Sequence, residues 1–261
     1  MTRTYVVTGA ASGIGHALAA RLRGEGHTVL GVDLRDTDIL VDLTTAQGRA
    51  DLVVQAGERS GGRIDAVVAV AGLAAPVPAT VGVNYFGAIA TLEGLRPLLA
   101  ESPAPRAALV SSLAAIDRVD PDLHAALLAG DEVRALALAA AITEAWTAES
   151  ENSIYNSTKN AIALWLRAQA PTPAWAGAGI PLNAVAPGVI ETPMTAEVLA
   201  SEEGRAMLAA GAPAPLNGPA APPTAPADLL AWLVGAENTY VTGQIIFADG
   251  GAEALRRPGV V

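Results

Sequence analysis

The sequence predicts an α/β protein in which one parallel sheet is covered by helices on both faces. Short apolar runs alternate along the chain with longer segments of helical pattern. These apolar runs rarely alternate with polar residues, which is typical of strands buried on both faces. A glycine-rich turn joins the first apolar run to the first helical segment. One domain of this kind accounts for all 261 residues.

The order of the elements follows from these patterns. The expected strands cover residues 5–7, 28–32, 39–41, 66–70, 107–110, 182–185 and 244–247. The expected helices cover residues 17–23, 45–59, 81–99, 154–168 and 228–234, and Gly24 and Gly26 close the first of them. Ligands of such sheets bind at the carboxyl ends of the strands. We therefore expect the functional side chains near strand ends or on the helices that follow.

Two segments break the alternation of strands and helices. Residues 113–153 are rich in alanine and predict a helical insertion. Residues 195–226 are rich in proline, alanine and glycine, which in a compact domain indicates a mobile lid or a disordered linker. We expect a single domain over residues 1–261, with the insertion at 113–153 and a substrate lid at 193–226.

Composition excludes several classes of function. The formal charge of −10 repels nucleic-acid phosphates and anionic lipids, so we expect neither nucleic acid nor membrane as a partner. The chain has no cysteine, and His16, His27 and His124 are scattered, so we expect no metal site. The amino terminus has no signal-peptide pattern, and no apolar run approaches the roughly 20 residues that span a bilayer. We expect a soluble, cytoplasmic protein.

The glycine-rich turn, residues 8–15, has the spacing G-x-x-x-G-x-G and precedes a helix. Glycine permits positive φ and close approach of a diphosphate, and a helix N-terminus supplies free N–H groups. Asp33 follows the second strand, where a carboxylate can bind ribose hydroxyls and repel a 2′-phosphate. This favours NAD over NADP, although the nearby Arg35 could tolerate a phosphate. Asp42 follows the third strand, where it either bonds the adenine amino group or caps a loop.

The pair Tyr155 and Lys159, four positions apart on a predicted helix, places both side chains on one face. An unperturbed phenol is too weakly acidic for proton transfer near neutral pH, and a nearby ammonium favours the phenolate. The chain has fifteen arginines and one lysine, and that lysine is Lys159. A guanidinium does not replace a compact ammonium in this task. The pair therefore predicts a proton donor and the group that lowers its pKa.

Taken together, the motifs resemble the short-chain dehydrogenase/reductase family over nearly the whole chain. They are T-G-x-x-x-G-I-G at residues 8–15, Ala71-Gly72 after the fourth strand, Asn84 within residues 83–87, Ser112 after the fifth strand, Tyr155 with Lys159, and P-G-V-I-E-T-P at residues 187–193. The resemblance implies a Rossmann fold with a doubly wound parallel sheet. One departure is A-V-A-G at residues 69–72, where the family usually has N-N-A-G. That change affects the support of the sheet more than the chemistry.

The resemblance also implies roles for individual residues. Tyr155 would be the general acid/base, Ser112 would orient the substrate oxygen, Lys159 would hold the nicotinamide ribose, and Asn84 would hold a relay water. Ser112 as a strand-end cap and Asn84 as a core hydrogen-bonding residue are the structural alternatives. The residues implied in binding NAD are Gly9, Ser12, Gly13, Ile14, Gly15, Asp33, Asp42, Leu43, Ala71, Gly72, Tyr155, Lys159, Pro187, Gly188, Ile190 and Thr192.

The segment between Ser112 and Tyr155 is longer than is common in the family. Such an insertion resembles the bacterial 3α-hydroxysteroid dehydrogenase/carbonyl reductase subgroup, in which it blocks a tetramer contact and supports a homodimer. Coniferyl-alcohol dehydrogenases have a similar insertion. The expected function is thus NAD-dependent interconversion of a small apolar alcohol and its ketone or aldehyde, with residues Met194, Leu199, Met207 and Leu208 of the lid as candidate substrate contacts. Aryl-alcohol dehydrogenase, biosynthetic ketoreductase and a non-enzymatic NAD-binding regulatory protein are the alternatives.

Overall fold

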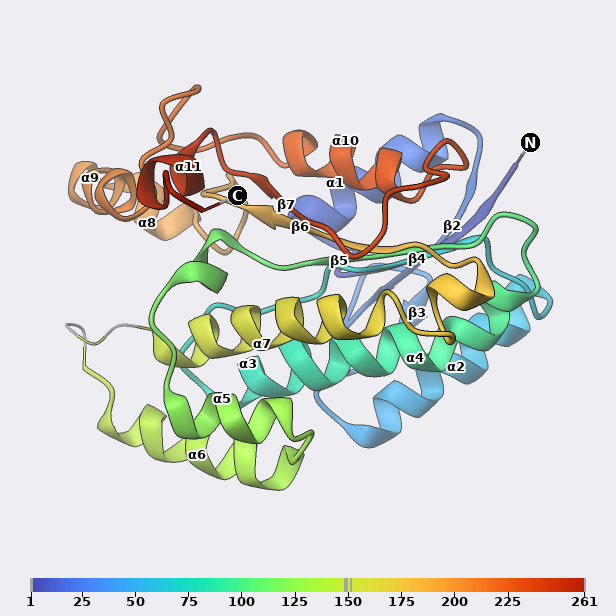
Figure 1. Cartoon of the computed structure of the whole chain (residues 1–261), viewed down its shortest axis with the longest axis horizontal. Helices are drawn as coiled ribbons and strands as arrows, with labels where there is room; N and C mark the ends of the chain where they lie inside the picture. The colour runs from blue at the N-terminus through green and yellow to red at the C-terminus, as the bar shows by residue number, and fades with distance from the viewer. Residues whose placement is uncertain (1, 148–149, 151, 261) are drawn as a thin grey trace.

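Seven parallel strands form one sheet in the order β3-β2-β1-β4-β5-β6-β7 (Figure 1). The structure is a computed structural model and describes residues 2–147, 150 and 152–260. The strands are β1 Thr4–Thr8, β2 Thr28–Asp33, β3 Ile39–Leu40, β4 Ala66–Ala69, β5 Arg106–Val110, β6 Leu182–Pro187 and β7 Ile245–Ala248. The predicted fold class, a doubly wound Rossmann-type sheet, is confirmed. The strand order reverses between β1 and β4, so the crevice for a ligand lies beyond their carboxyl ends.

Helices cover both faces of this sheet, as Figure 1 shows. On one face lie α1 (Gly13–Gly24) and α10 (Thr224–Leu233), and on the other lie α2 (Ala46–Ser60), α4 (Ala88–Ala100) and α7 (Ser153–Gln169). Each face has its own apolar cluster of strand and helix residues. β4 is buried along its whole length, which explains why its sequence, A-V-V-A, shows no alternation.

The single long helix expected at residues 81–99 is divided into three parts. A short α3 (Pro78–Val81) leads into a π-helical turn, η1 (Gly82–Gly87), and then into α4. Both glycines of η1 contact the segment after β3: a Cβ at Gly82 would lie 3.2 Å from Thr44 Cβ, and one at Gly87 would lie 3.0 Å from the Leu43 carbonyl oxygen. The periodicity of the sequence does not reveal this π-turn, since such turns are rare and occur mostly as single turns inside α-helices.

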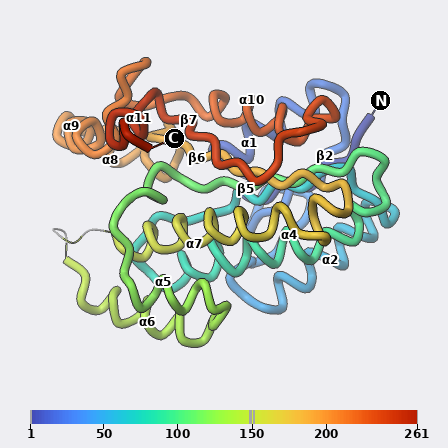
Figure 2. The backbone as a smooth tube through the Cα atoms, viewed as in Figure 1, coloured from blue at the N-terminus to red at the C-terminus, as the bar shows by residue number. Residues whose placement is uncertain are grey.

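Residues 113–145 form a short 3₁₀ turn and a helical hairpin. These elements are η2 (Leu113–Ile116), α5 (Pro121–Leu128) and α6 (Glu132–Ala145). The hairpin lies against α7 and α3, on the side away from the sheet (Figures 1 and 2). Leu123 and Leu127 of α5 are completely buried and belong to the same apolar cluster as the helices beneath the sheet.

The segment expected as an irregular lid contains two helices, α8 (Ala196–Ala200) and α9 (Glu202–Gly211). Ser201 caps α9 by accepting a hydrogen bond from the Gly204 amide over 2.9 Å. All residues of α8 and α9 are described, and none of them is buried. The remaining elements are η3 (Ala176–Ala178) and α11 (Ala252–Arg256), the latter close to α8 and α9 in Figure 1.

Candidate active site

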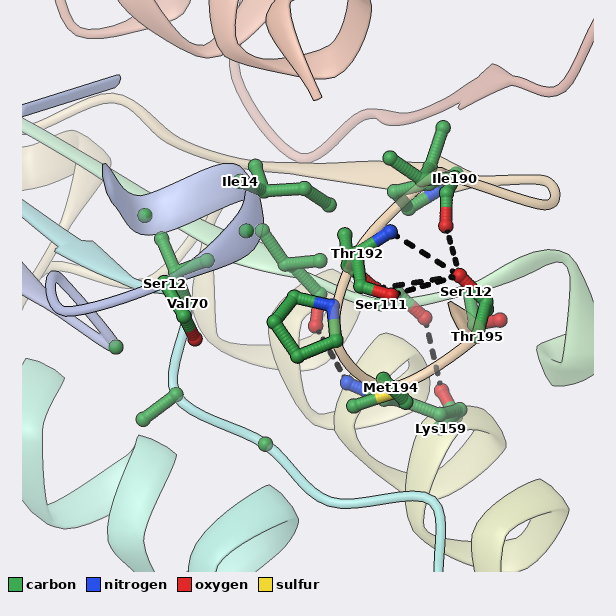
Figure 3. A pocket seen from close by; sticks show the side chains of 18 of the residues that line it. Ser12, Ile14, Val70, Ser111, Ser112, Lys159, Ile190, Thr192, Met194 and Thr195 are labelled. Carbon is green, nitrogen blue, oxygen red and sulfur yellow. Dashed lines mark hydrogen bonds between the residues drawn. The ribbon is translucent and has the colours of Figure 1, made fainter. Parts of the chain in front are cut away.

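A pocket lies at the carboxyl edge of the sheet, where the glycine turn, α7 and the loops after β4, β5 and β6 meet (Figure 3). Most of the residues that the sequence singled out line it. The lining residues are Gly9, Ser12, Gly13, Ile14, Gly15, Val70, Ala71, Gly72, Val110, Ser111, Ser112, Tyr155, Lys159, Pro187, Gly188, Ile190, Thr192, Pro193, Met194 and Thr195. The topology therefore brings the glycine turn and the Tyr155–Lys159 pair to one crevice.

The glycine turn packs too tightly for side chains at its key positions. Gly9 and Gly13 have positive φ angles of 69° and 53°. A Cβ at Gly9 would lie 2.9 Å from the Ala71 nitrogen, and one at Gly13 would lie 3.1 Å from Thr192 Cγ2. The Thr8 hydroxyl ties this turn to the next by accepting bonds from the amides of residues 70 and 71, each over 3.0 Å. The exposed backbone and the start of α1 fit a diphosphate.

Asp33 lies at the end of β2 and supports the glycine turn. Its Oδ2 accepts a bond from the Ala11 amide over 3.0 Å, and its Oδ1 accepts one from the Leu34 amide over 2.7 Å. A carboxylate can accept about four hydrogen bonds, so Asp33 can still accept bonds from the ribose hydroxyls of a bound cofactor. The Arg35 side chain is 84% exposed and its nearest acidic partner is Asp36 at 4.0 Å, which leaves it available to a phosphate as well.

Asp42 has a role within its own loop. Its Oδ1 accepts bonds from the Thr44 amide over 2.9 Å and from the Thr44 hydroxyl over 2.7 Å. This is the loop-capping alternative that the sequence left open. Leu43 is buried. Within the described residues, the lining of the pocket does not include Asp33, Asp42 or Leu43, which lie farther along the carboxyl edge toward β2 and β3.

The hydroxyls of Ser112 and Tyr155 come from two different elements. Ser112 precedes η2 and caps it, accepting a bond from the Ala114 amide over 3.1 Å. Tyr155 lies in the first turn of α7, which Asn152 caps by accepting a bond from the Tyr155 amide over 3.1 Å. Burial raises the pKa of the Tyr155 phenol, and its hydrogen bond with Ser112 acts in the opposite direction.

Lys159 is buried and only 4% exposed. Burial lowers the pKa of its ammonium to about 8. Its Nζ donates to the Val110 carbonyl over 2.9 Å and lies 5.7 Å from the centre of the Tyr155 ring. The role of Lys159 in lowering the pKa of Tyr155 stays a prediction; in the protein alone, burial raises that pKa and the Ser112 hydrogen bond opposes the rise.

Asn84 lies behind the pocket wall, in the π-helical turn. Its Oδ1 accepts a bond from the Leu73 amide over 2.8 Å, while its Nδ2 donates to the Leu73 carbonyl over 2.9 Å and to Thr158 Oγ1 over 3.2 Å. Gly72 separates this amide from the pocket: a Cβ there would lie 3.0 Å from Asn84 Oδ1 and 3.7 Å from Lys159 Nζ. These bonds give Asn84 the structural role of the two alternatives, and its part in a proton relay stays a prediction.

The loop after β6 contributes Ile190 and Thr192, and it also contains a residue that the sequence analysis missed. Thr195 Oγ1 donates to the Ile190 carbonyl over 2.5 Å and accepts from the Thr192 amide over 3.1 Å (Figure 3). Thr195 thus closes the turn that lines the pocket. Ser111, also missed, donates to the Lys159 carbonyl over 3.0 Å. Its position directly before Ser112 was the available signal.

The four expected substrate contacts do not all gather at the pocket. Met194 lines it and is 49% exposed. Leu199 lines a separate cavity on the other side of the 191–193 segment. Met207 is 61% exposed, and neither it nor Leu208 is among the described residues that line these two cavities. Their role as substrate contacts therefore stays a prediction that the lining of these cavities does not support.

Two further properties concern only the described part of the chain. No helix within it is long and apolar enough to cross a membrane. Among residues 2–147, 150 and 152–260, no three His, Asp or Glu side chains gather in a way that could hold a metal ion.

Comparison with known proteins decides the family. A family model described as enoyl-(acyl carrier protein) reductase matches residues 9–253. A 3-alpha-hydroxysteroid dehydrogenase/carbonyl reductase of Comamonas testosteroni is 35% identical over 97% of this chain and 97% of its own length.

The chain belongs to the short-chain dehydrogenase/reductase family.

Other members of the family agree with this assignment. A cis-4-hydroxycyclohexanecarboxylate dehydrogenase of Sinomonas cyclohexanicum is 30% identical, with 97% of each chain covered. The crystal structure of a 3-alpha-hydroxysteroid dehydrogenase from Pseudomonas sp. B-0831, complexed with NADH, superposes with a TM-score of 0.86. That protein is 36% identical, and the match covers 99% of this chain and 100% of the other. The family motifs of this short-chain dehydrogenase/reductase thus converge on the pocket of Figure 3.

Proposed function

We propose that the chain is an NAD(H)-dependent oxidoreductase that interconverts an apolar alcohol and its ketone or aldehyde. The observation that carries the proposal is the meeting of Ser112, Tyr155 and Lys159 with the glycine turn in one pocket. The relatives from Comamonas and Sinomonas are named for alcohol or carbonyl substrates, and the Pseudomonas structure contains NADH. When bound, the cofactor supplies or accepts the hydride.

The residues of the chain have distinct tasks in this proposal. Tyr155 exchanges a proton with the substrate oxygen, and the Ser112 hydroxyl orients that oxygen between the two side chains. Lys159 bears its charge on a compact ammonium at the back of the pocket, where it can bind ribose hydroxyls. Gly9, Gly13 and the start of α1 receive the diphosphate.

The apolar substrate class has its own support. The apolar lining residues that are not assigned to the cofactor are Val70, Val110, Pro193 and Met194, and the Met194 side chain is half-exposed. A hydroxysteroid, or a smaller alicyclic or aryl alcohol, suits such a surface. The substrate oxygen would lie between the Ser112 and Tyr155 hydroxyls, and apolar contacts would hold the rest.

The test is a screen of steroid, alicyclic, aryl and aliphatic alcohols with NAD, read as NADH absorbance. We expect turnover on at least one cyclic or aryl alcohol. Tyr155→Phe should lose about a thousandfold or more in turnover, since the proton donor is gone. Its NADH affinity, measured by fluorescence, should stay within a few-fold of wild type.

Two results would contradict the proposal. Turnover retained in Tyr155→Phe would place the proton transfer at another group. NADH binding without oxidation of any alcohol, or reduction of any carbonyl, would favour the regulatory alternative, in which the pocket binds the cofactor and performs no reaction.

A further inference from the structure

Residues 115–124 of the insertion are joined to α7 by four hydrogen bonds that involve side chains. Asn156 Nδ2 donates to the Arg118 carbonyl over 3.1 Å. The Asp120 amide donates to the Ser157 hydroxyl over 3.0 Å. The other two bonds both use the side chain of Asn160. The three α7 side chains, Asn156, Ser157 and Asn160, lie within five residues after Tyr155. The insertion is therefore bonded to the N-terminal part of the helix that contains the candidate acid/base.

Asn160 bonds to two different parts of the insertion. Its Nδ2 donates to the Ala115 carbonyl in η2 over 2.7 Å. Its Oδ1 lies 2.8 Å from Nε2 of His124 in α5. Because the amide nitrogen is the donor to Ala115, the amide oxygen must accept, and His124 must carry a proton on Nε2. This bond persists whether the imidazole is neutral or protonated, since Nε2 is a donor in both states.

These contacts connect the two candidate catalytic hydroxyls through a short path. Ser112 caps η2 through the Ala114 amide, and Ala115 is the next residue of that turn. Asn160 lies little more than one helical turn beyond Tyr155 on α7. The bond between Asn160 and the Ala115 carbonyl therefore closes a ring that includes both Ser112 and Tyr155.

We propose that Asn160, held by His124 of the insertion, is a positioning residue that sets the placement of the Ser112 hydroxyl against Tyr155. The inference rests on the proposed function for its effect on catalysis. Without the Asn160 amide, η2 keeps its own cap but loses its polar attachment to α7. The Ser112 hydroxyl then moves with η2, while the glycine turn and the cofactor site are unaffected.

The consequence for the reaction follows from the Ser112–Tyr155 hydrogen bond. That bond opposes the effect of burial on the phenol, so its weakening leaves the pKa of Tyr155 higher. A higher pKa leaves less phenolate for alcohol oxidation at a given pH. A general loss of stability would not shift the pH profile in this way, which makes the profile the decisive measurement.

The experiment compares four variants. Asn160→Leu removes both amide bonds at similar volume, and His124→Phe removes the donor to the amide oxygen. His124→Gln retains an N–H donor, and Asp122→Asn changes an exposed residue in the first turn of the same helix. We expect Asn160→Leu to lower kcat about tenfold and His124→Phe about threefold, since small misplacements of reacting groups are costly. Both should raise the apparent pKa of the oxidation profile, with NADH affinity within about twofold of wild type.

His124→Gln and Asp122→Asn should match the wild type in kcat and in pH profile. The proposal is overturned if Asn160→Leu is folded and has an unchanged kcat and profile. It is also overturned if Asn160→Leu loses NADH affinity by the same factor as kcat and His124→Gln has the same low kcat as His124→Phe. That pattern indicates a general loss of the fold.

A second readout needs no substrate and separates this inference from the proposed function. The chain has four tyrosines, so tyrosine labelled with ¹³C at Cζ gives four NMR signals, and comparison with Tyr155→Phe assigns the signal of Tyr155. We expect Asn160→Leu to raise the pH midpoint of the Tyr155 signal, and Asp122→Asn to leave it unchanged. An unchanged midpoint in folded Asn160→Leu overturns the inference even if the protein oxidises none of the tested alcohols.

Discussion

The Lys159 ammonium is buried, and burial disfavours its charged form. Its pKa falls from 10.5 to about 8, and among the residues that the structure describes its hydrogen-bond partner is the Val110 carbonyl. A shift of this size corresponds to roughly 3 kcal/mol against the charged form. The folded chain bears this penalty below pH 8, and the penalty disappears as the pH rises from about 8 to 10.5, where the unfolded lysine also loses its proton.

Replacing this lysine should therefore stabilise the protein. We expect Lys159→Met to raise the free energy of unfolding by about 1–2 kcal/mol at pH 7, less than the full penalty because the Val110 carbonyl loses its donor. Denaturant titrations at pH 7 and pH 10 measure this gain, which should shrink at the higher pH. A variant less stable than wild type at pH 7 would show that the ammonium is well compensated in its site.

Asp33 and Asp42 offer a matched pair of carboxylates. Asp33→Asn keeps the shape of the side chain and removes the charge that repels a 2′-phosphate. We expect the affinity for NADPH relative to NADH to rise about tenfold. Asp42→Asn should leave this ratio unchanged, because the Asp42 carboxylate bonds to Thr44. Equal ratios in wild type and Asp33→Asn, measured by fluorescence titration, would remove Asp33 from cofactor selection.

Among the elements, substitutions in α5 show whether the insertion unfolds together with the sheet or as an independent unit. Leu127 is completely buried in the main apolar cluster, and its neighbour Leu128 is 48% exposed. We expect Leu127→Ala to lower the free energy of unfolding by about 2–4 kcal/mol in one cooperative transition, and Leu128→Ala to change it by less than about 0.5 kcal/mol. A separate early transition in Leu127→Ala would instead show that the hairpin unfolds alone.

For the assembled protein, the position of the hairpin bears on the oligomeric state. α5 and α6 cover parts of α7 and α3 that face away from the sheet, so these surfaces are not open to another chain (Figure 1). Together with the family resemblance, this leads us to expect a homodimer. Light scattering coupled to size exclusion measures the mass directly. A mass of one chain or of four chains would contradict the expectation.

The sequence alone was sufficient to place the strands along the chain and to name most of the residues that line the pocket. Both depend on local signals: apolar runs in buried strands, a glycine turn that tolerates positive φ, and an i, i+4 pair on a helix. Gly9, Ser112, Tyr155 and Lys159 could be named because their spacing repeats a family pattern. The order of the strands in the sheet, which the sequence analysis did not predict, brings these residues together.

Contacts between distant segments decided the rest. The π-turn that contains Asn84 packs against residues 43–44, burial raises the pKa of Tyr155, and the Met207 side chain of α9 is exposed. The pairing of His124 with Asn160 joins an inserted helix to α7. No periodicity in one segment encodes such contacts, because their energies arise only when the chain has folded and both partners are desolvated together.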